Sequence, residues 1–413
     1  MNFPVYLDNH ATTKVDTRVL EVMLPCFSEN FGNAASRQHK FGWRAEEVVE
    51  HSRKSIAKFF NAESSEIIFT AGATESNNLA IQGIVESYKQ KGNHIITCAT
   101  EHHSVLDVCK HLEKRGTEIT YLRVDKYGML DLEELKNSIK ETTILISLMA
   151  ANNEIGTIHP LKTIGAISRE HNILFHTDAT QLVGKILMDV QKLKIDLLSF
   201  SGHKIYGPKG IGALYVRKKN PRVNLTPINF GGGQEKGLRS GTLNVPGIAG
   251  MGKAVEICMN EIETETQKMF SFRNLLQKKL FEEIPDIWLN GHPTERISNN
   301  VNIGFDSVDA QALMMGMKEI AVSSGSACST SQALPSHVLK AIGLSSEKAH
   351  SCIRFGIGRF NTEEEIEYTA KRVREVVEQL RSVLPKYKVR GSKERHTELH
   401  EMNSGQVISA SLQ

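Results

Sequence analysis

A lysine and an acid end two neighbouring apolar runs of this sequence. Lys204 closes the segment Ser201-Gly202-His203-Lys204, which follows the strand-like run 195–200 and precedes a Gly/Pro turn at 206–210. Asp178 ends a second strand-like run at 173–178. A lysine amine can form a Schiff base with an aldehyde, and a nearby acid can keep a pyridine nitrogen protonated so that the ring accepts electrons. The pair predicts a pyridoxal phosphate (PLP) site; the alternative is a solvated lysine in a surface loop.

A phosphate site is predicted where a strand turns into a helix, at residues 70–76. The Gly72 turn would let the backbone N–H groups of Ala73 and Thr74 approach an anion, which a helix N-terminus also favours. The alternative is an ordinary helix cap by Thr74. Further donors are available from the lysine segment and from the segment that follows Gly231-Gly232-Gly233, namely Ser201, His203, Arg239, Ser240 and Thr242.

Polar residues follow other strand-like runs and could bind the cofactor ring or the substrate. Asn153 follows the run 143–149, and Gln181 lies three residues after Asp178; either amide could donate to a phenolic oxygen, although Asn-Asn also marks turns. His102 follows the run 94–98 and could stack on the ring and relay protons, or be a turn residue. Arg354 could bind a carboxylate in a bidentate manner, or form a structural ion pair.

One of the six cysteines differs from the others in its surroundings. Cys328 lies in Ser323-Ser324-Gly325-Ser326-Ala327-Cys328-Ser329, whose small polar residues predict an exposed loop, and a nearby cation would favour its thiolate. No C-x-x-C pair is present, so neither a disulfide framework nor a zinc site is expected. Of the remaining cysteines, three lie in apolar patterns and are expected to be buried, Cys98, Cys109 and Cys258, and two are ambiguous, Cys26 and Cys352.

Composition excludes several classes of partner. A length of 413 residues predicts two domains. The net charge of +3, with basic and acidic residues interspersed, gives no reason to expect nucleic-acid binding. No apolar run approaches the ~20 residues of a membrane-spanning helix, and the N-terminus lacks the pattern of a targeting segment. With dispersed cysteines, this predicts a cytoplasmic protein.

The elements that must position these residues alternate between strand and helix patterns from about 45 to 260. Strand-like runs at 66–70, 94–98, 119–124 and 143–149 are separated by helix-length segments, for example 75–89 and 105–114. This alternation predicts a mainly parallel sheet with helices on both faces. Sites in such sheets lie at the carboxyl ends of the strands, where the polar residues above are found.

The pattern changes near residue 260 and predicts a smaller α+β domain. It contains a helix at 259–284, a strand at 301–305 and a last helix that starts at Thr362 with Glu365 as a capping box. We therefore predict a large PLP-binding domain at 16–260 and a small domain, carrying the cysteine loop, at 1–15 and 261–385. Residues 386–413 are predicted to be a polar, flexible tail.

Seven segments, in order from about residue 5 to 380, together resemble the cysteine desulfurases of the NifS/IscS type, which are class V aminotransferase-like PLP enzymes of fold type I. They are Leu7-Asp8-Asn9-His10-Ala11-Thr12-Thr13, Gly72-Ala73-Thr74-Glu75-Ser76, Asn152-Asn153-Glu154-Ile155-Gly156, His176-Thr177-Asp178-Ala179-Thr180-Gln181, Ser201-Gly202-His203-Lys204, Arg239-Ser240-Gly241-Thr242 and Ser323-Ser324-Gly325-Ser326-Ala327-Cys328.

The resemblance implies a role for each candidate residue and a large domain built on a mainly parallel, seven-stranded sheet. Lys204 would bind PLP covalently, Asp178 would pair with the pyridine nitrogen, and His102 would stack on the ring. Cys328 would be the nucleophile that becomes a persulfide. The remaining contacts would come from Asn153 and Gln181 to the phenolic oxygen, from Thr74, Ser201 and His203 to the phosphate, and from Thr242 of the partner subunit in a homodimer.

The implied activity is conversion of L-cysteine to L-alanine, with the sulfur passed to an iron–sulfur scaffold protein or a tRNA-thiolation relay. No resident metal is expected; Cys328 would meet iron only on a partner. Alternatives are selenocysteine lyase or aminotransferase chemistry on the same scaffold, or a non-catalytic iron–sulfur assembly adaptor. The chain departs from the family's usual pattern at Asn9-His10, at Ala34 in place of proline, and in the tail after Pro385.

Overall fold

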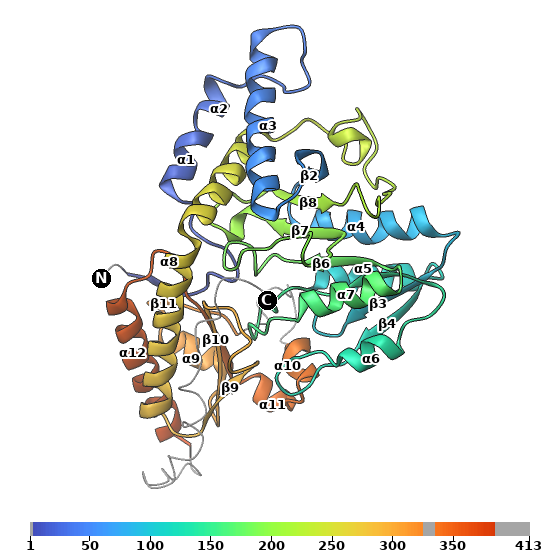
Figure 1. The fold of residues 1–413 in the computed structure, drawn as a ribbon. Helices are drawn as coiled ribbons and strands as arrows, with labels where there is room; N and C mark the ends of the chain where they lie inside the picture. Colours follow the sequence, from blue (N-terminus) through green and yellow to red (C-terminus); the bar gives the residue numbers. More distant parts are fainter. Residues whose placement is uncertain (1–2, 325–334, 385–413) are drawn as a thin grey trace.

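The computed structural model describes residues 3–324 and 335–384 (Figure 1). Cys328 and the predicted tail at 386–413 lie outside the described residues. No helix within the described ranges is long and apolar enough to cross a membrane.

A seven-stranded sheet forms the centre of the larger unit, in the order β2-β8-β7-β6-β5-β3-β4. Neighbouring strands are parallel except that β8 is antiparallel to both β2 and β7. All residues of the strands other than β4 are buried, as expected for a sheet covered on both faces. This confirms the predicted mainly parallel sheet. The strands are β2 (Ile67–Thr70), β3 (His94–Cys98), β4 (Glu118–Leu122), β5 (Thr143–Ser147), β6 (Leu174–Asp178), β7 (Leu197–Ser201) and β8 (Gly212–Val216).

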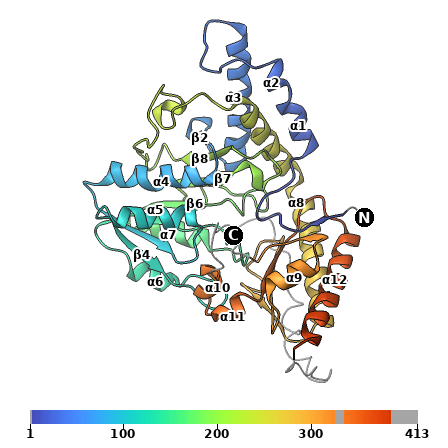
Figure 2. The same cartoon turned by 180° about the vertical axis from the view of Figure 1, so that it is seen from behind.

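Helices cover both faces of this sheet because successive strand residues point to opposite sides. Ile95 and Leu174 pack with α4 and α5, whereas Ile96 and Phe175 pack with α3, α7 and α8. Figure 2 shows α4 and α5 side by side on one face. The helices of this unit, including short 3₁₀ turns, are α1 (Thr17–Met23), α2 (Pro25–Ser28), α3 (Lys40–Phe60), η1 (Ser64–Glu66), α4 (Ala73–Tyr88), α5 (His103–Glu113), α6 (Leu132–Asn137), α7 (Leu161–Glu170), η2 (Gly202–Lys204) and η3 (Glu235–Gly237).

A second hydrophobic core lies around an antiparallel three-stranded sheet in the order β12-β10-β9. The last helix begins after Thr362, whose side chain and that of Glu365 cap each other's backbone N–H groups, so the predicted capping box is confirmed. The elements are β1 (Val5–Tyr6), which pairs in parallel with β11 (Ile320–Ala321), β9 (Ile287–Asn290), β10 (Asn300–Phe305), α9 (Ala310–Gly316), α10 (His337–Ala341), α11 (Ser346–Ala349), β12 (Cys352–Gly356) and α12 (Glu363–Ser382).

One long helix, α8 (Val245–Glu283), joins the two cores. Its first half contributes Ile248 and Val255 to the core around the large sheet, and its second half contributes Leu276 and Leu280 to the other core. In Figure 1 it runs from α3 to α12. The predicted start of this helix at 259 was wrong, because α8 begins at Val245. The domain boundaries, one of which falls inside α8, remain a prediction.

Candidate active site

The site is built around Lys204, at the end of one 3₁₀ turn that follows β7. Gly202 starts this turn in a confined position: a side chain there would meet Ile211 at 3.0 Å and the carbonyl oxygen of Pro208 at 3.1 Å. The Lys204 amine donates to the carbonyl oxygens of His10 and of Ala11, the latter at 2.7 Å. The N-terminal segment is therefore held against the lysine that lies almost two hundred residues later in the chain.

A cavity of about 710 Å³ opens beside this lysine. Its walls come from the ends of β2, β3, β5, β6 and β7, which lie at one edge of the sheet because these strands run in the same direction. Ten predicted site residues line it together: Ala73, Thr74, His102, Asn153, Asp178, Gln181, Ser201, His203, Lys204 and Arg354. The other two do not join them: Thr242 is exposed and does not line this cavity, and Cys328 lies outside the described residues.

Asp178 is buried and fixed by two donors. One carboxylate oxygen accepts from the Asn77 side-chain amide at 2.7 Å, and the other accepts from the backbone N–H of Thr180 at 3.0 Å. The same Asn77 nitrogen lies 2.8 Å from the Ser104 hydroxyl, which is 2.8 Å from Nδ1 of His102. A continuous hydrogen-bonded chain thus connects the acid to the imidazole. Sequence reasoning missed Asn77, although its position one helical turn after Thr74 was a usable signal.

His102 is the N-cap of α5, and this fixes its tautomer. The backbone N–H of Ser104 donates to Nδ1 at 3.1 Å, so Nδ1 is an acceptor and the neutral ring carries its proton on Nε2. Burial lowers the pKa of His102 below its usual value, with the charge of Asp178 opposing and that of Lys204 adding to the shift. His102 is therefore a neutral donor through Nε2 near pH 7.

The predicted phosphate turn has the geometry of an anion site. Helix α4 starts after Gly72 without a side-chain cap, so the alternative that Thr74 caps this helix was wrong. The first N–H groups of a helix, including those of Ala73 and Thr74, have no partner within the helix. Gly212 of β8 packs against the turn so closely that a side chain there would lie 2.6 Å from the Cα of Gly72. Arg239 pairs with Glu75 at 2.9 Å and neutralises the one acid of this turn.

Arg354 was predicted either to bind a carboxylate or to form a structural ion pair, and its surroundings allow both. It forms an ion pair with Asp8 at 2.8 Å and donates to the carbonyl oxygen of Asn153 at 2.9 Å, while it also lines the cavity. Its Nε is buried and has no hydrogen-bond partner among the described residues. One edge of the guanidinium is thus anchored, and Nε retains an unused donor.

Gln181 is held by His10, which the sequence marked only as a departure from the family pattern. Nδ1 of His10 lies 3.0 Å from the Gln181 side-chain oxygen, and the Gln181 amide donates to the His10 carbonyl oxygen at 3.1 Å. Burial lowers the pKa of His10 well below its usual value, and the positive charge of Arg354 adds to this. The pair fixes the direction in which Gln181 faces the cavity.

These residues fit PLP. The cavity brings together an amine, a carboxylate, the neutral imidazoles of His102 and His203 and the uncapped N-terminus of α4, which match an aldehyde, a pyridine nitrogen and a phosphate. Burial lowers the pKa of the second imidazole, that of His203, to about 4. A buried polar atom, Oδ1 of Asn77, has no partner among the described residues.

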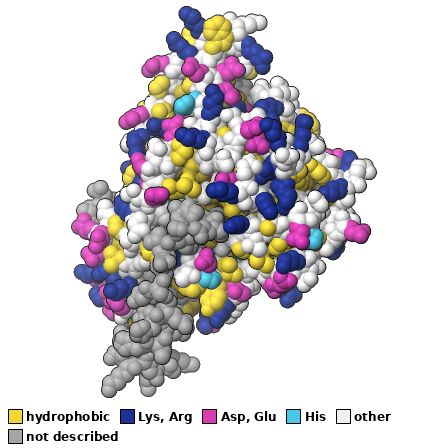
Figure 3. All heavy atoms as spheres, viewed as in Figure 1, with side chains coloured by type: hydrophobic (Ala, Val, Ile, Leu, Met, Phe, Trp, Pro, Cys, Tyr) yellow, Lys and Arg dark blue, Asp and Glu magenta, His cyan; other side chains and the backbone are white. Residues whose placement is uncertain are grey.

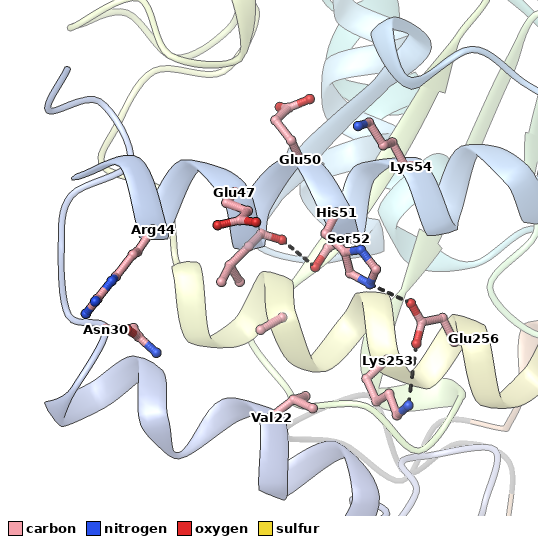
Figure 4. A pocket seen from close by; sticks show the side chains of 12 residues that line it. Val22, Asn30, Arg44, Glu47, Glu50, His51, Ser52, Lys54, Lys253 and Glu256 are labelled. Carbon is pink, nitrogen blue, oxygen red and sulfur yellow. Dashed lines mark hydrogen bonds and ion pairs between the residues drawn. The ribbon is translucent and has the colours of Figure 1, made fainter. Parts of the chain in front are cut away.

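A second cavity, of about 720 Å³, contains none of the predicted site residues. It lies between α3, α8 and the α1–α2 segment, and Glu256 on its wall pairs with both His51 and Lys253 (Figure 4). His51 lies 2.9 Å from Glu256, which also accepts from Lys253 at 3.5 Å. In the part of the chain that the structure describes, no cluster of His, Cys, Asp and Glu could hold a metal ion.

The described cysteines are all buried, namely Cys26, Cys98, Cys109, Cys258 and Cys352. This confirms the prediction for Cys98, Cys109 and Cys258 and decides the two that were ambiguous. Burial raises the pKa of these thiols, to about 12 for Cys98, Cys109 and Cys352. Buried thiols of this kind are poor nucleophiles.

Comparison with known proteins agrees with the geometry. The family model "Aminotransferase class-V" matches residues 5–369. Two curated relatives are named cysteine desulfurase IscS. The one from Anaeromyxobacter sp. (strain Fw109-5) is 51% identical over 389 residues, which is 94% of this chain and 96% of the relative. The one from Ehrlichia chaffeensis is 52% identical over 385 residues, which is 93% of this chain and 94% of the relative.

Solved structures give the same answer. A NifS-like protein superimposes with a TM-score of 0.84 at 38% identity, covering 91% of this chain and 99% of the other. A structure described as SspA in complex with cysteine gives a TM-score of 0.77 at 38% identity, covering 87% of this chain and all of the other (100%). The chain therefore belongs to the class V aminotransferase family and, within it, to the PLP-dependent cysteine desulfurases of the IscS and NifS type.

Proposed function

We propose that this enzyme converts L-cysteine to L-alanine and holds the released sulfur as a persulfide on Cys328. The observation that carries the proposal is that Asp178 ends β6, Lys204 ends the 3₁₀ turn after the adjacent strand β7, and both line one cavity with His102. Bound PLP supplies an electron sink for the bond-breaking step at the substrate Cα. Ala73, Thr74, Ser201 and His203 would hold its phosphate, and Asp178 would keep the pyridine nitrogen protonated.

The proton movements fall to Lys204 and His102. Lys204 would bind the cofactor covalently and, once displaced by the substrate amine, take up the Cα proton. Because Nε2 of His102 carries a proton, this imidazole is suited to donate or relay a proton at the same face of the cavity. Asn153 and Gln181 would contact the phenolic oxygen.

The substrate would be oriented by its carboxylate. Arg354 lines the cavity beside Asn153, where Asp8 holds its guanidinium in place, and guanidinium geometry suits a carboxylate. The thiolate of Cys328 would then attack the substrate sulfur, forming an S–S bond as the C–S bond breaks. The carbon takes the electron pair and a proton and leaves as alanine.

The proposed assembly is a homodimer in which Thr242 completes the phosphate site of the partner subunit. Thr242 is exposed and lies outside the cavity of its own chain. Apolar side chains on the α1–α3 segment support a second copy as the occupant, since Leu24, Phe27 and Phe31 expose 62%, 63% and 62% of their surface. Figure 3 shows hydrophobic surface at the tip of the molecule, where α3 begins, with basic and acidic side chains around it.

Sedimentation velocity tests this assembly. Phe27→Glu combined with Phe31→Glu should shift a dimer to monomers, because two charges would be buried in the interface. Met315→Glu is the matched control, since Met315 is also exposed (68%) but lies on α9. A monomeric wild type, or a double variant that sediments as wild type does, would refute the interface.

The proposed sulfur acceptors are an iron–sulfur scaffold protein and a tRNA-thiolation relay, and the proposed compartment is the cytoplasm. The scaffold protein is supported as an acceptor by relatives named cysteine desulfurase IscS, which are 51% and 52% identical to this chain over 94% and 93% of its length.

Product analysis with two variants tests the chemistry. Lys204→Ala should abolish both alanine formation and the yellow absorbance of the covalently bound cofactor. Cys328→Ser should keep the absorbance, bind L-cysteine and form no protein persulfide. Normal desulfuration by Cys328→Ser would show that the nucleophile lies elsewhere or that the reaction is a simple lyase, and a keto-acid product would indicate a transaminase. A protein that cannot be loaded with PLP would be an adaptor.

A further inference from the structure

A second lysine lies directly behind the first and has no place in the mechanism above. Lys185 is 4% exposed and does not line the cavity. Its side-chain amine donates to the backbone carbonyl oxygen of Lys204 at 2.8 Å. It therefore contacts the lysine segment from the protein interior.

Lys185 is itself held firmly between two elements. The preceding Gly184 has φ +76°, and a side chain there would meet Ile205 at 2.8 Å and the sulfur of Cys258 at 3.0 Å. The carbonyl oxygen of Lys185 accepts from the Thr266 hydroxyl on α8 at 2.8 Å. The amine is thus presented to Lys204 by a backbone fixed against the helix that joins the two cores.

A buried amine at this place is costly, which argues for a specific use. Burial lowers the pKa of Lys185 to about 8, with Cys258 and Glu265 opposing this shift and Arg359 adding to it. An apolar side chain of similar length would fill the same space without that cost.

The contact fixes the peptide bond that follows Lys204 at both of its polar atoms. Lys185 binds the oxygen, and the N–H of Ile205 donates to the Gly202 carbonyl oxygen at 3.1 Å. One residue further on, the N–H of Tyr206 donates to the Thr13 hydroxyl at 2.8 Å. The orientation of this peptide sets the direction in which the Lys204 side chain leaves the turn.

We propose that Lys185 is a positioning residue for Lys204: by binding the Lys204 carbonyl oxygen it fixes the turn η2, so that the Lys204 amine is directed to the cofactor aldehyde. The inference rests on the proposed covalent role of Lys204. Misplacement of a reacting group by about 1 Å can slow a reaction ~10²-fold, so loss of this contact should be measurable in Schiff-base formation itself.

The test is the covalent capture of PLP by the cofactor-free, full-length protein, which needs no turnover. Capture is followed by the visible absorbance after mixing and by borohydride reduction with peptide mapping. Lys185→Met should slow capture at Lys204 by about 10-fold or more. Pyridoxine 5′-phosphate, which has no aldehyde, should bind within about twofold of its wild-type affinity, because the phosphate and ring contacts remain. Lys185→Arg, which keeps a donor, should recover part of the rate.

Lys192→Met is the matched control, since Lys192 exposes 84% of its side chain and lies in the same stretch of chain. The proposal would be overturned if Lys185→Met captured PLP as fast as this control does. It would also be overturned if the affinity of Lys185→Met for pyridoxine 5′-phosphate fell by the same factor as its capture rate, because that would indicate a general collapse of the cavity. If Lys185→Met does not fold, Lys185→Leu, which also lacks a donor, is judged by the same two measurements. Reduction of the wild type at a residue other than Lys204 would instead refute the proposed function.

Discussion

Asp178 and His102 are linked through two neutral side chains, Asn77 and Ser104. A carboxylate that accepts from a buried amide is oriented by a charge-assisted hydrogen bond, which is stronger than a neutral one. Because the amide of Asn77 also reaches Ser104, one side chain sets the positions of both the acid and the imidazole. We therefore expect loss of the Asn77 side chain to weaken cofactor binding, although Asn77 lies far from Lys204 in the sequence.

Asn77→Ala should weaken PLP binding about tenfold, since a hydrogen bond to a charged group contributes about 1.5–3 kcal/mol. Equilibrium dialysis of PLP against the cofactor-free protein measures the loss. Asn78→Ala is the control, because the hydrogen bonds of the Asn78 side chain to described residues all lie within α4, to Thr74 and Gln82. Equal PLP affinities of the two variants would show that Asn77 does not organise Asp178.

Residue types at strand ends were sufficient to predict most of the site. Asp178 ends a buried strand, Lys204 and His102 each follow one, and parallel strands bring such positions together. Asn77 and His10 were missed because their roles depend on which side chain packs opposite them, and spacing along the chain does not contain that information. His10 meets Gln181 across 171 positions of sequence.

At the scale of elements, the close contact between α3 and α8 stabilises the core around the seven-stranded sheet. Gly252 lets the two helices approach until a side chain on it would lie 2.6 Å from the Cβ of Ser52. Gly250 likewise leaves room for the sulfur of Met23, 2.5 Å from where a Cβ would be. Small residues at such contacts let the ridges of one helix pack more closely into the grooves of the other.

Gly252→Ala should therefore destabilise the protein by about 1–3 kcal/mol, because an added methyl group overpacks this contact and outweighs the better helix propensity of alanine. Urea unfolding gives the free energy. Ser52→Gly in the same chain should recover part of the loss, since it removes the Ser52 Cβ and Oγ that the methyl group would meet and leaves only the Cα in contact. A Gly252→Ala variant at least as stable as the wild type would contradict the packing at this contact.

The same glycines explain where the sequence failed to predict an element. The start of α8 contains Pro246, Gly247, Gly250 and Gly252, a composition typical of a loop, yet Asn244 caps the helix and proline is tolerated in its first turn. The strands that were predicted for the large sheet agree with the structure to within two residues at each end, because each is a mostly apolar run, whereas β8 was not predicted. Close approach between helices is a tertiary requirement that helix propensity does not reveal.

At the scale of the whole molecule, Arg359 ties the parts together. Its guanidinium pairs with Asp16 before α1 at 2.6 Å and with Glu265 on α8, and it stacks on the ring of Tyr206 beside the lysine turn. The backbone N–H of Arg359 also donates to the Tyr206 hydroxyl at 2.6 Å. The second core is thus connected to the turn that carries Lys204, and both cores are expected to respond together when the fold is weakened.

Acid should weaken the fold through buried histidines, and His159 offers the clearest test. Both of its ring nitrogens are buried without a hydrogen-bond partner among the described residues, and burial lowers its pKa to about 4. A histidine with a lower pKa in the folded than in the unfolded chain binds fewer protons when folded, so stability falls as the pH drops from about 6.5 to 4. The penalty at pH 4 is about 3 kcal/mol relative to pH 7.

His159→Leu removes this titration while keeping an apolar side chain of similar size. Its gain in unfolding free energy over the wild type should be smallest at pH 7 and grow by about 3 kcal/mol at pH 4, because only the wild type must keep a buried imidazole uncharged. Comparing variant with wild type cancels the opposing effect of Glu154, whose pKa burial raises to about 7. His171→Leu is the control, since His171 is exposed. If the gain of His159→Leu stays constant between pH 7 and 4, the imidazole is hydrated in the folded protein and is not a source of acid sensitivity.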